Sequence, residues 1–443
     1  MHAFLVFPML VMGSLPHAGQ IAASHLGSVS VRTSSTVRGD TVRLTLAEVS
    51  RLARTHGLDL DAERRLIAMA GGDLRQAKVE GLNPSVGYQR FESTRSGRPA
   101  EFGVTLSQSL GWLVERGPRV GAARAALDRT VAEVDDVERL AVRDAGQRFV
   151  AALAANRRLA LAEQIAAATQ RLYDITRIQL REGEISLLEA NLAEIEYGRA
   201  EAKALAAGRE VLASLLELRR LTGLAPMVPI VLVETPDFDP PTGALPEDSL
   251  VTVAIQRRPD VTARRLAVEE ASLRQRLARR EGMPVPSLNG FLTRDDGESG
   301  SRLGLGVSLP VALLDRNQGR VDREAASLER ARIRLEAAQL AVRLEVREAR
   351  LAYLSASEES ARLESRVLEP ARANIALVDS AYRAGKLGLP TLLLLRNQLV
   401  EAELDYWQAW QARREALLRL RAAVGLPAAP DDPTTTLPPK DTP

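Results

Sequence analysis

The stretch Leu303-Gly304-Leu305-Gly306-Val307-Ser308-Leu309 alternates between large apolar residues and glycine or serine. A period of two residues is the pattern of a β-strand whose two faces meet different surroundings. The first half of the chain holds a similar stretch, Phe102-Gly103-Val104-Thr105-Leu106-Ser107. Strands of this kind suit a wall with lipid on one side and water on the other. A turn-rich loop precedes each strand, so we predict two β-hairpins, at about 84–111 and 286–311.

The two hairpins belong to a longer internal repeat. Pro84-Ser85 recurs as Pro286-Ser287 at a separation of 202, and Arg119-Val120 recurs as Arg320-Val321 at 201. Ordered matches at nearly constant separation indicate two tandem structural repeats, which we place at 46–224 and 250–426. The other segments are a predicted signal peptide (1–24), an N-terminal periplasmic extension (25–45), a linker with six prolines (225–249) and a disordered tail (427–443).

Each repeat also contains a helix that is too long for an ordinary globular domain. These long helices are predicted at about 117–181 and 319–383. Val120, Leu127, Val134 and Ala141 keep the seven-residue spacing of a coiled-coil seam, and Val321, Leu328, Leu335 and Val342 repeat it. Such a helix is roughly 100 Å long. We expect each repeat to run as a helix, a hairpin, a long helix and a return helix, with the long helix beside the two shorter ones placed end to end.

The N-terminus predicts export from the cytoplasm. Ala3 to Leu15 is an apolar stretch of signal-peptide length, and small residues follow at Ala18 and at Ala22-Ala23-Ser24. The stretch lacks a basic start, so a buried or disordered leader is the alternative. No other segment approaches the length of a transmembrane helix. A membrane crossing by this chain would therefore have to be made by strands.

Composition excludes several classes of function. The chain has no cysteine, and its four histidines all lie within the first 56 residues. This excludes Ser-His and Cys-His catalysis and the usual zinc sites from almost the whole sequence. The 59 basic and 57 acidic residues are interleaved, so the basic face of a nucleic-acid binder is absent. We expect no enzyme activity, no catalytic residue, no cofactor, no metal site and no nucleic-acid partner.

Closure of the sheet predicts the number of subunits. Two hairpins give four strands per chain, which are too few for a closed barrel, and open strand edges are not tolerated in lipid. Three chains would supply twelve strands, an even number within the known range. The fold we expect is mainly α-helical with a small membrane β part. It is a homotrimeric 12-stranded β-barrel that continues into a periplasmic tunnel of long coiled-coil helices.

Taken in order, these features make the sequence resemble the TolC-type outer-membrane efflux proteins over nearly the whole mature chain. The resemblance rests on the twofold repeat, on Leu46 and Leu250 at the repeat starts, on Arg258-Pro259-Asp260, and on the Arg-x-Gly turns at 181 and 383. It implies a homotrimer in contact with outer-membrane lipid, with most of each chain in the periplasm.

The resemblance also implies a mechanism and partners. The trimer would be a passive exit duct that receives substrates from a periplasmic adaptor (membrane fusion) protein and an inner-membrane resistance-nodulation-division (RND) transporter. Within the family the chain is most similar to the branch that serves heavy-metal pumps, which would make heavy-metal cations the exported substrates. Relatives often carry a lipid anchor on an N-terminal cysteine, and this chain has no cysteine to carry one.

The two helix turns are the candidate sites for adaptor contact or gating. Glycine permits the tight reversal at each turn. Relatives often place acidic residues just past these glycines, and the first turn fits that pattern whereas the second has Leu392-Leu393-Leu394. We hypothesise an apolar constriction at the second turn and a charge gate at the first. The alternatives are that the leucines simply pack between helices and that the charged residues of the turns only cap the helices. The candidate residues are Arg181, Gly183, Glu184, Glu189, Arg383, Gly385, Lys386 and Leu394.

Two other functions remain open at this point. A periplasmic adaptor also carries a long helical hairpin, but it would need a single hairpin flanked by β-rich domains. A coiled-coil scaffold without a pore would explain the helices, but it would explain neither the alternating strands nor the leader.

Overall fold

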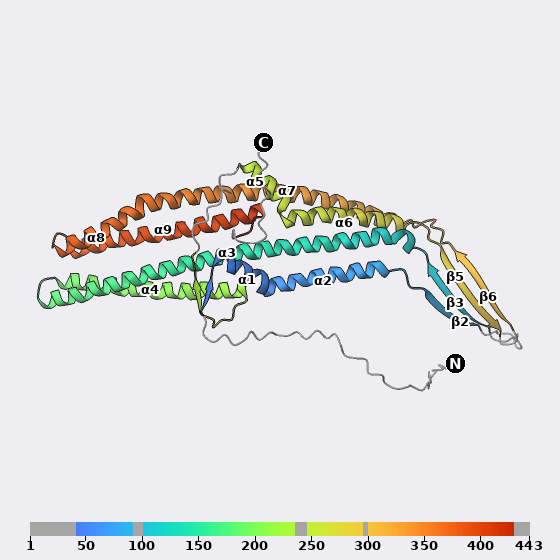
Figure 1. The fold of residues 1–443 in the computed structure, drawn as a ribbon, viewed down its shortest axis with the longest axis horizontal. Helices are drawn as coiled ribbons and strands as arrows, with labels where there is room; N and C mark the ends of the chain where they lie inside the picture. Colours follow the sequence, from blue (N-terminus) through green and yellow to red (C-terminus); the bar gives the residue numbers. More distant parts are fainter. Residues whose placement is uncertain (1–40, 92–100, 235–245, 296–299, 429–443) are drawn as a thin grey trace, which may run out of the picture. The chain divides into compact units, whose positions relative to one another are not determined.

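The computed structural model describes residues 41–91, 101–234, 246–295 and 300–428, which fall within one unit of the chain. Two similar halves follow one another (Figure 1). The first half contains β1 (Val42–Leu44), α1 (Leu46–His56), α2 (Leu58–Val79), β2 (Ser85–Phe91), β3 (Glu101–Ser109), α3 (Trp112–Arg181) and α4 (Leu187–Thr222). The second contains α5 (Glu247–Arg257), α6 (Pro259–Glu281), β5 (Ser287–Asp295), β6 (Ser301–Ser308), α7 (Gln318–Leu363), η2 (Glu364–Leu368), α8 (Glu369–Arg383) and α9 (Leu389–Val424), and β4 (Ile230–Leu232) lies between the halves. The predicted signal peptide lies outside the described residues.

Each half opens with two helices where the sequence analysis expects one. In the first half the break falls at Gly57, whose backbone is extended; a Cβ there would lie 2.7 Å from the carbonyl oxygen of Ala53. In the second half the break falls at Arg258, because the following Pro259 disfavours a helical conformation in the residue before it. The two breaks turn the chain between α1 and α2 and between α5 and α6.

Helix α3 is longer than expected and begins at Trp112 instead of near Gly117. At 70 residues it is about 105 Å long. It runs through Gly117 and Pro118, two residues that disfavour helix interiors. The side chain of Arg119 pairs with Glu115 one turn earlier at 2.7 Å and so stabilises this turn.

The second long helix is not uniform. It consists of α7, a five-residue π-helix, η2, and α8. Pro370 lies in the first turn of α8, two residues after the end of η2; it has no N–H to donate, and its ring would collide with the carbonyl group four residues earlier. The wider π turn accommodates this local misfit.

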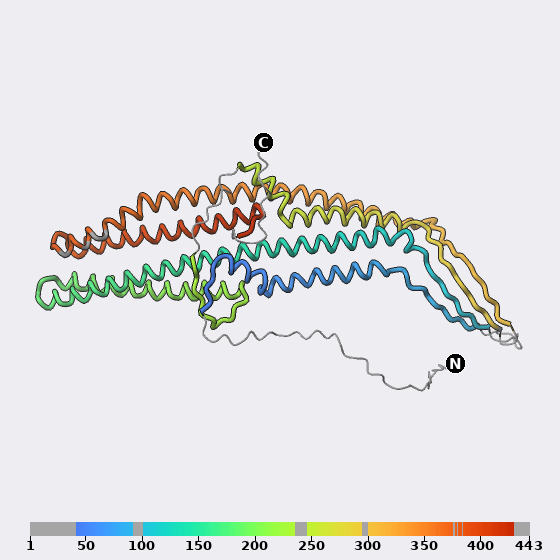
Figure 2. Tube along the Cα trace, in the orientation of Figure 1, coloured from blue at the N-terminus to red at the C-terminus, as the bar shows by residue number. Residues whose placement is uncertain are grey.

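The helices lie side by side as the repeat pattern predicts (Figure 2). The long helix α3 packs against α4 along one part of its length and against α2 along the other. In the second half α7 packs against α6 and α9, while α8 packs against α9. Contacts of α3 with α6 and with α9 join the two halves.

Of two buried clusters near the middle of the chain's helices, the first lies where the halves meet and the second lies within the second half. One contains Phe149, Leu218, Trp410 and Leu418 from α3, α4 and α9, and it also includes Leu44 of β1. The other gathers α5, α7 and the end of α9 around Leu250, Val346 and Leu420. Alanines at many of the remaining buried positions let the helix axes approach closely.

The two hairpins form one antiparallel sheet in the order β2-β3-β5-β6. In the register, Val104 of β3 lies between Tyr88 of β2 and Leu292 of β5, and Leu292 in turn faces Leu303 of β6. Because side chains alternate across a sheet, these apolar residues share one face. The opposite face carries mainly glycine, serine, threonine and asparagine, with the ring of Phe291 over Gly304. The expected division into an apolar and a polar face is therefore present.

A second, smaller sheet was not expected from the sequence. β1 and β4 pair in parallel, with Val42 opposite Ile230 and Leu44 opposite Leu232. These strands lie in the segments that the sequence analysis assigns to the N-terminal extension and to the proline-rich linker. Their pairing joins the segment before α1 to the segment that follows α4.

Candidate functional site

The first helix turn joins α3 and α4 in a regular hairpin, and we call residues 181–189 the first tip. Gly183 has a φ of +76°, which favours glycine. The N–H of Gly183 donates to the carbonyl oxygen of Leu180, and that of Glu184 donates to Gln179 at 2.8 Å. This is the Schellman arrangement that ends many helices. It presents Arg181 and Glu184 at the surface.

Glu189 at the first tip has a local role. With Ser186 it forms a capping box at the start of α4. The backbone N–H and the hydroxyl of Ser186 each donate to the Glu189 carboxylate at 2.9 Å, and these bonds lower the pKa of that carboxyl group. The sequence Ser186-Leu187-Leu188-Glu189 carries the signature of this capping box, which was not predicted at this position. The Glu189 carboxylate, which we hypothesised to form part of a charge gate, is therefore already hydrogen-bonded at the start of α4.

The second helix turn, the second tip (383–394), repeats the same end geometry. Gly385 has a φ of +69°, and the N–H groups of Gly385 and Lys386 donate to Tyr382 and Ala381, both at 2.9 Å. The start of the return helix differs, because Gly388 caps α9 without a side-chain bond and Pro390 occupies the first turn. Lys386 is exposed, and the side chain of Arg383 lies outside the described part of the structure.

The leucines of the second tip divide into two groups. Leu389, Leu392 and Leu393 are buried against Leu172 of α3 and Ala193 of α4, so they join the two helical pairs. Leu394, the proposed constriction residue, is 59% exposed. The alternative interpretation, packing between helices, thus describes Leu392 and Leu393, while Leu394 remains available at the surface.

Aromatic and charged side chains of α3, α4 and α8 lie beside this cluster. The rings of Tyr173 in α3 and Tyr197 in α4 stack with centroids 5.6 Å apart, and the guanidinium of Arg177 lies 5.6 Å from the centre of Tyr173. Burial, and then the negative charge of Glu189, raise the pKa of Tyr382. Tyr382 of α8 packs against the same buried cluster as Tyr173 of α3.

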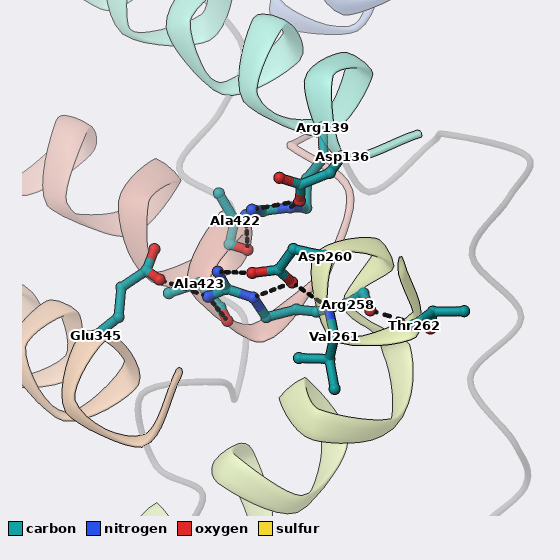
Figure 3. A network of polar contacts seen from close by, with 9 residues as sticks. All are labelled: Asp136, Arg139, Arg258, Asp260, Val261, Thr262, Glu345, Ala422 and Ala423. Carbon is teal, nitrogen blue, oxygen red and sulfur yellow. Dashed lines mark hydrogen bonds and ion pairs between the residues drawn. The ribbon is translucent and has the colours of Figure 1, made fainter. Parts of the chain in front are cut away.

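A polar network lies away from the tips, at the start of α6 (Figure 3). The guanidinium of Arg258 pairs with Asp260 and with Glu345 of α7, and it donates to the carbonyl oxygen of Ala423. Arg139 of α3, itself paired with Asp136, donates to the neighbouring carbonyl of Ala422 at 2.7 Å. Both arginines thus stabilise the negative end of α9. The motif Arg258-Pro259-Asp260 is a structural clamp that joins three helices.

The geometry can be compared with known proteins. A family model shows that the chain belongs to the outer membrane efflux protein family; it matches residues 60–224 and 250–426. The chain is therefore an outer-membrane protein with a large periplasmic helical part, and it acts as the outer-membrane duct of a tripartite efflux system. The family consists of channels and not of enzymes. A comparison with curated proteins gives no match.

Solved structures share the fold. A membrane protein from Pseudomonas aeruginosa has a TM-score of 0.73 at 18% identity, over 86% of this chain and 92% of that one. The Campylobacter jejuni CmeC outer membrane channel has a TM-score of 0.73 at 16% identity, over 86% and 85%. The open state of the Neisseria gonorrhoeae MtrE outer membrane channel has a TM-score of 0.68 at 19% identity, over 86% and 89%.

The described residues lack two further features. None of the helices in that part of the chain is both long enough and apolar enough to span a bilayer. The same residues contain no cluster of three or more His, Cys, Asp or Glu side chains arranged to hold a metal ion.

Proposed function

We propose that three copies of the chain close into the exit duct. The four-stranded sheet supports this, because its outer strands β2 and β6 run in opposite directions. An antiparallel pair can therefore form between β6 of one copy and β2 of the next. Three copies give the twelve strands that closure in lipid requires.

The helices support the same arrangement. Apolar side chains more than half exposed follow a heptad-like spacing on α7, at Ile333, Leu340, Leu344 and Leu351. A second stripe on α4 contains Leu205, Leu212 and Leu216. The two helices lie in different halves of the chain and have different neighbours: α4 packs mainly against α3, whereas α7 packs against α6 and α9. A neighbouring subunit would cover both stripes and bury apolar area.

The subunit number can be tested on detergent-extracted protein. We expect a protein mass near three times the 48.1 kDa of the chain. The double variant Leu340→Gln/Leu344→Gln should shift the population towards the monomer. Glu336→Gln/Arg343→Gln, which changes exposed charged residues of the same helix, is the matched control and should remain trimeric. A monomer or dimer from the unaltered protein would contradict the proposal.

We also propose that the two tips bind the periplasmic adaptor, which in turn joins an inner-membrane RND pump. Arg181, Glu184 and Lys386 are exposed there on backbone held by Schellman turns. Fixed turns of this kind present charge with little loss of entropy on binding. The charge reversal Lys386→Glu should weaken adaptor binding, whereas Lys203→Glu on the exposed side of α4 should not. Equal binding by both variants would remove Lys386 from the contact.

The exported substrate is a further proposal. Resemblance to the heavy-metal branch of the family supports heavy-metal cations, and the duct itself would be passive. A strain lacking this protein should become more sensitive to zinc, cobalt or cadmium salts, and the intact gene should restore growth. Unchanged metal tolerance together with increased sensitivity to organic toxins would favour a different pump partner.

A further inference from the structure

A pocket rich in arginine lies between α3, α6 and α7. Its volume is about 220 Å³, and we call it the arginine pocket. Five arginines line it: Arg129, Arg264, Arg274, Arg330 and Arg334. The acidic residues in its lining are Glu133 and Glu270. Neither the adaptor contact nor the gate proposed above uses these side chains.

A buried carboxylate organises the pocket. Glu270 is only 5% exposed, and a buried charge must be paired to be tolerated. Its two oxygens accept from Nε of Arg129 at 2.8 Å and pair with Nη2 of Arg274 at 2.5 Å. Arg129 also pairs with Glu133 at 2.7 Å. These contacts hold two guanidinium groups in fixed positions at the wall of the pocket.

The remaining arginines give the pocket a surplus of positive charge. Within the described part of the chain, Arg264, Arg330 and Arg334 have no ion pair, so five arginines against two glutamates leave a charge of +3. Like charges at close range repel one another. A soluble anion would relieve that repulsion.

The small residues in the lining leave room for such an anion. On α6, Ala267 and Ala271 stand between Arg264 and Arg274, and on α7 Ala331 stands between Arg330 and Arg334. Alanine side chains are too short to fill the space between the helices. The pocket therefore combines charged walls with an open floor of small side chains.

We propose that the arginine pocket binds a multiply charged oxyanion of the phosphate type. The guanidinium group is planar and always charged, and it donates two parallel hydrogen bonds to phosphate oxygens. The pocket is large enough for a mono- or diphosphate group. This chemistry is shared by a soluble phosphorylated compound and by the headgroup of an anionic lipid. All five arginines come from one chain, so the site needs no neighbouring subunit and does not depend on the proposed assembly.

Calorimetric titration of full-length protein in a non-ionic detergent tests the proposal, with sodium pyrophosphate as the probe at constant ionic strength. The unaltered protein should bind saturably, and sulfate should compete where chloride does not. The triple variant Arg264→Gln/Arg330→Gln/Arg334→Gln should lose at least about tenfold in affinity for pyrophosphate. Each hydrogen bond between a guanidinium and a phosphate oxygen contributes substantially to binding, and the variant removes three such donors. These side chains are exposed, so the fold should tolerate the change.

The control variant also removes three positive charges, but from arginines outside the pocket. Arg209→Gln/Arg343→Gln/Arg366→Gln alters three exposed arginines outside the pocket and should bind pyrophosphate within about twofold of the unaltered protein. Equal losses in both triple variants, or no saturable binding by the unaltered protein, would overturn the proposal. Loss of pyrophosphate binding in nanodiscs of phosphatidylglycerol, but not of phosphatidylcholine, would identify a lipid headgroup as the natural ligand. Unchanged binding in both would identify a soluble phosphate compound.

Discussion

Arg258 and Asp260, two residues apart at the start of α6, form a bidentate ion pair, with Nε–Oδ1 at 3.0 Å and Nη2–Oδ2 at 2.8 Å. The remaining nitrogen of Arg258 reaches Glu345 at 2.7 Å and the carbonyl oxygen of Ala423 at 3.1 Å. One side chain therefore links α6, α7 and the end of α9. Only 5% of the Arg258 side chain is exposed, so its guanidinium is shielded from water.

Replacing Arg258 with glutamine should destabilise the protein by about 3 kcal/mol, because it leaves Asp260 without its charge partner and the carbonyl of Ala423 without a donor. Thermal unfolding followed by circular dichroism would measure the loss. Arg209→Gln, an exposed arginine of α4, is the control and should leave the midpoint nearly unchanged. A midpoint for Arg258→Gln that equals the control would show that the clamp is dispensable.

The same pair predicts how stability depends on pH. Burial alone would raise the pKa of Asp260, but the hydrogen bonds and charge of Arg258, with a contribution from Arg139, lower it below its ordinary 3.8. A lowered pKa in the folded state means that the stabilisation is complete above pH 3.8 and is lost as the pH falls through the folded value. Asp260→Asn should flatten this acid limb of stability. A curve parallel to that of the unaltered protein would contradict the assignment.

The fold could be predicted wherever apolar residues recur at one constant spacing over a long stretch of sequence. The seven-residue spacing anticipated the burial of Val134, Leu328 and Val342, and the period of two anticipated both faces of the four-stranded sheet. The pairing of Val42 with Ile230 was not predictable. Strands of three residues are too short to show a period, and nothing local indicates a partner so far along the chain.

A contact within the sheet gives a test of its polar face. The ring of Phe291 on β5 lies over Gly304 of β6, and a Cβ at Gly304 would overlap the ring. Gly304→Ala should therefore displace the ring and cost about 1–3 kcal/mol. We expect the proposed trimer, extracted in detergent, to dissociate at a lower temperature in gel electrophoresis.

Gly306 is the matched control for that variant. It lies two residues along the same strand and on the same face, but a Cβ there would meet no atom within 4 Å. Gly306→Ala should leave the dissociation temperature unchanged, and Phe291→Ala should relieve the effect of Gly304→Ala in the double variant. Equal behaviour of the two glycine variants would refute the role of the ring.

The candidate site was only partly predictable, for a physical reason. Gly183 and Gly385 stand out in the sequence because a left-handed residue at a helix end favours glycine, and both adopt that conformation. The clamp partners of Arg258 lie 87 and 165 residues away, so its contacts follow only from the packing of three helices. The motif Arg258-Pro259-Asp260 was part of the resemblance to the family, but its structural role as a clamp could not be predicted from the sequence.

The last prediction concerns the proposed constriction at the second tip. Leu394 is exposed, whereas Leu392, two residues earlier, is 1% exposed and joins the two helical pairs. If three copies of Leu394 narrow the entrance, Leu394→Ser should raise the single-channel conductance in planar bilayers, because a hydroxyl lets water occupy an apolar constriction. Leu377→Ser, which replaces an exposed leucine of α8, should not change conductance. Leu392→Ser should instead destabilise the tip by about 2–5 kcal/mol, since it removes a buried side chain. An unaltered conductance in Leu394→Ser would leave the leucines of this turn with a packing role alone.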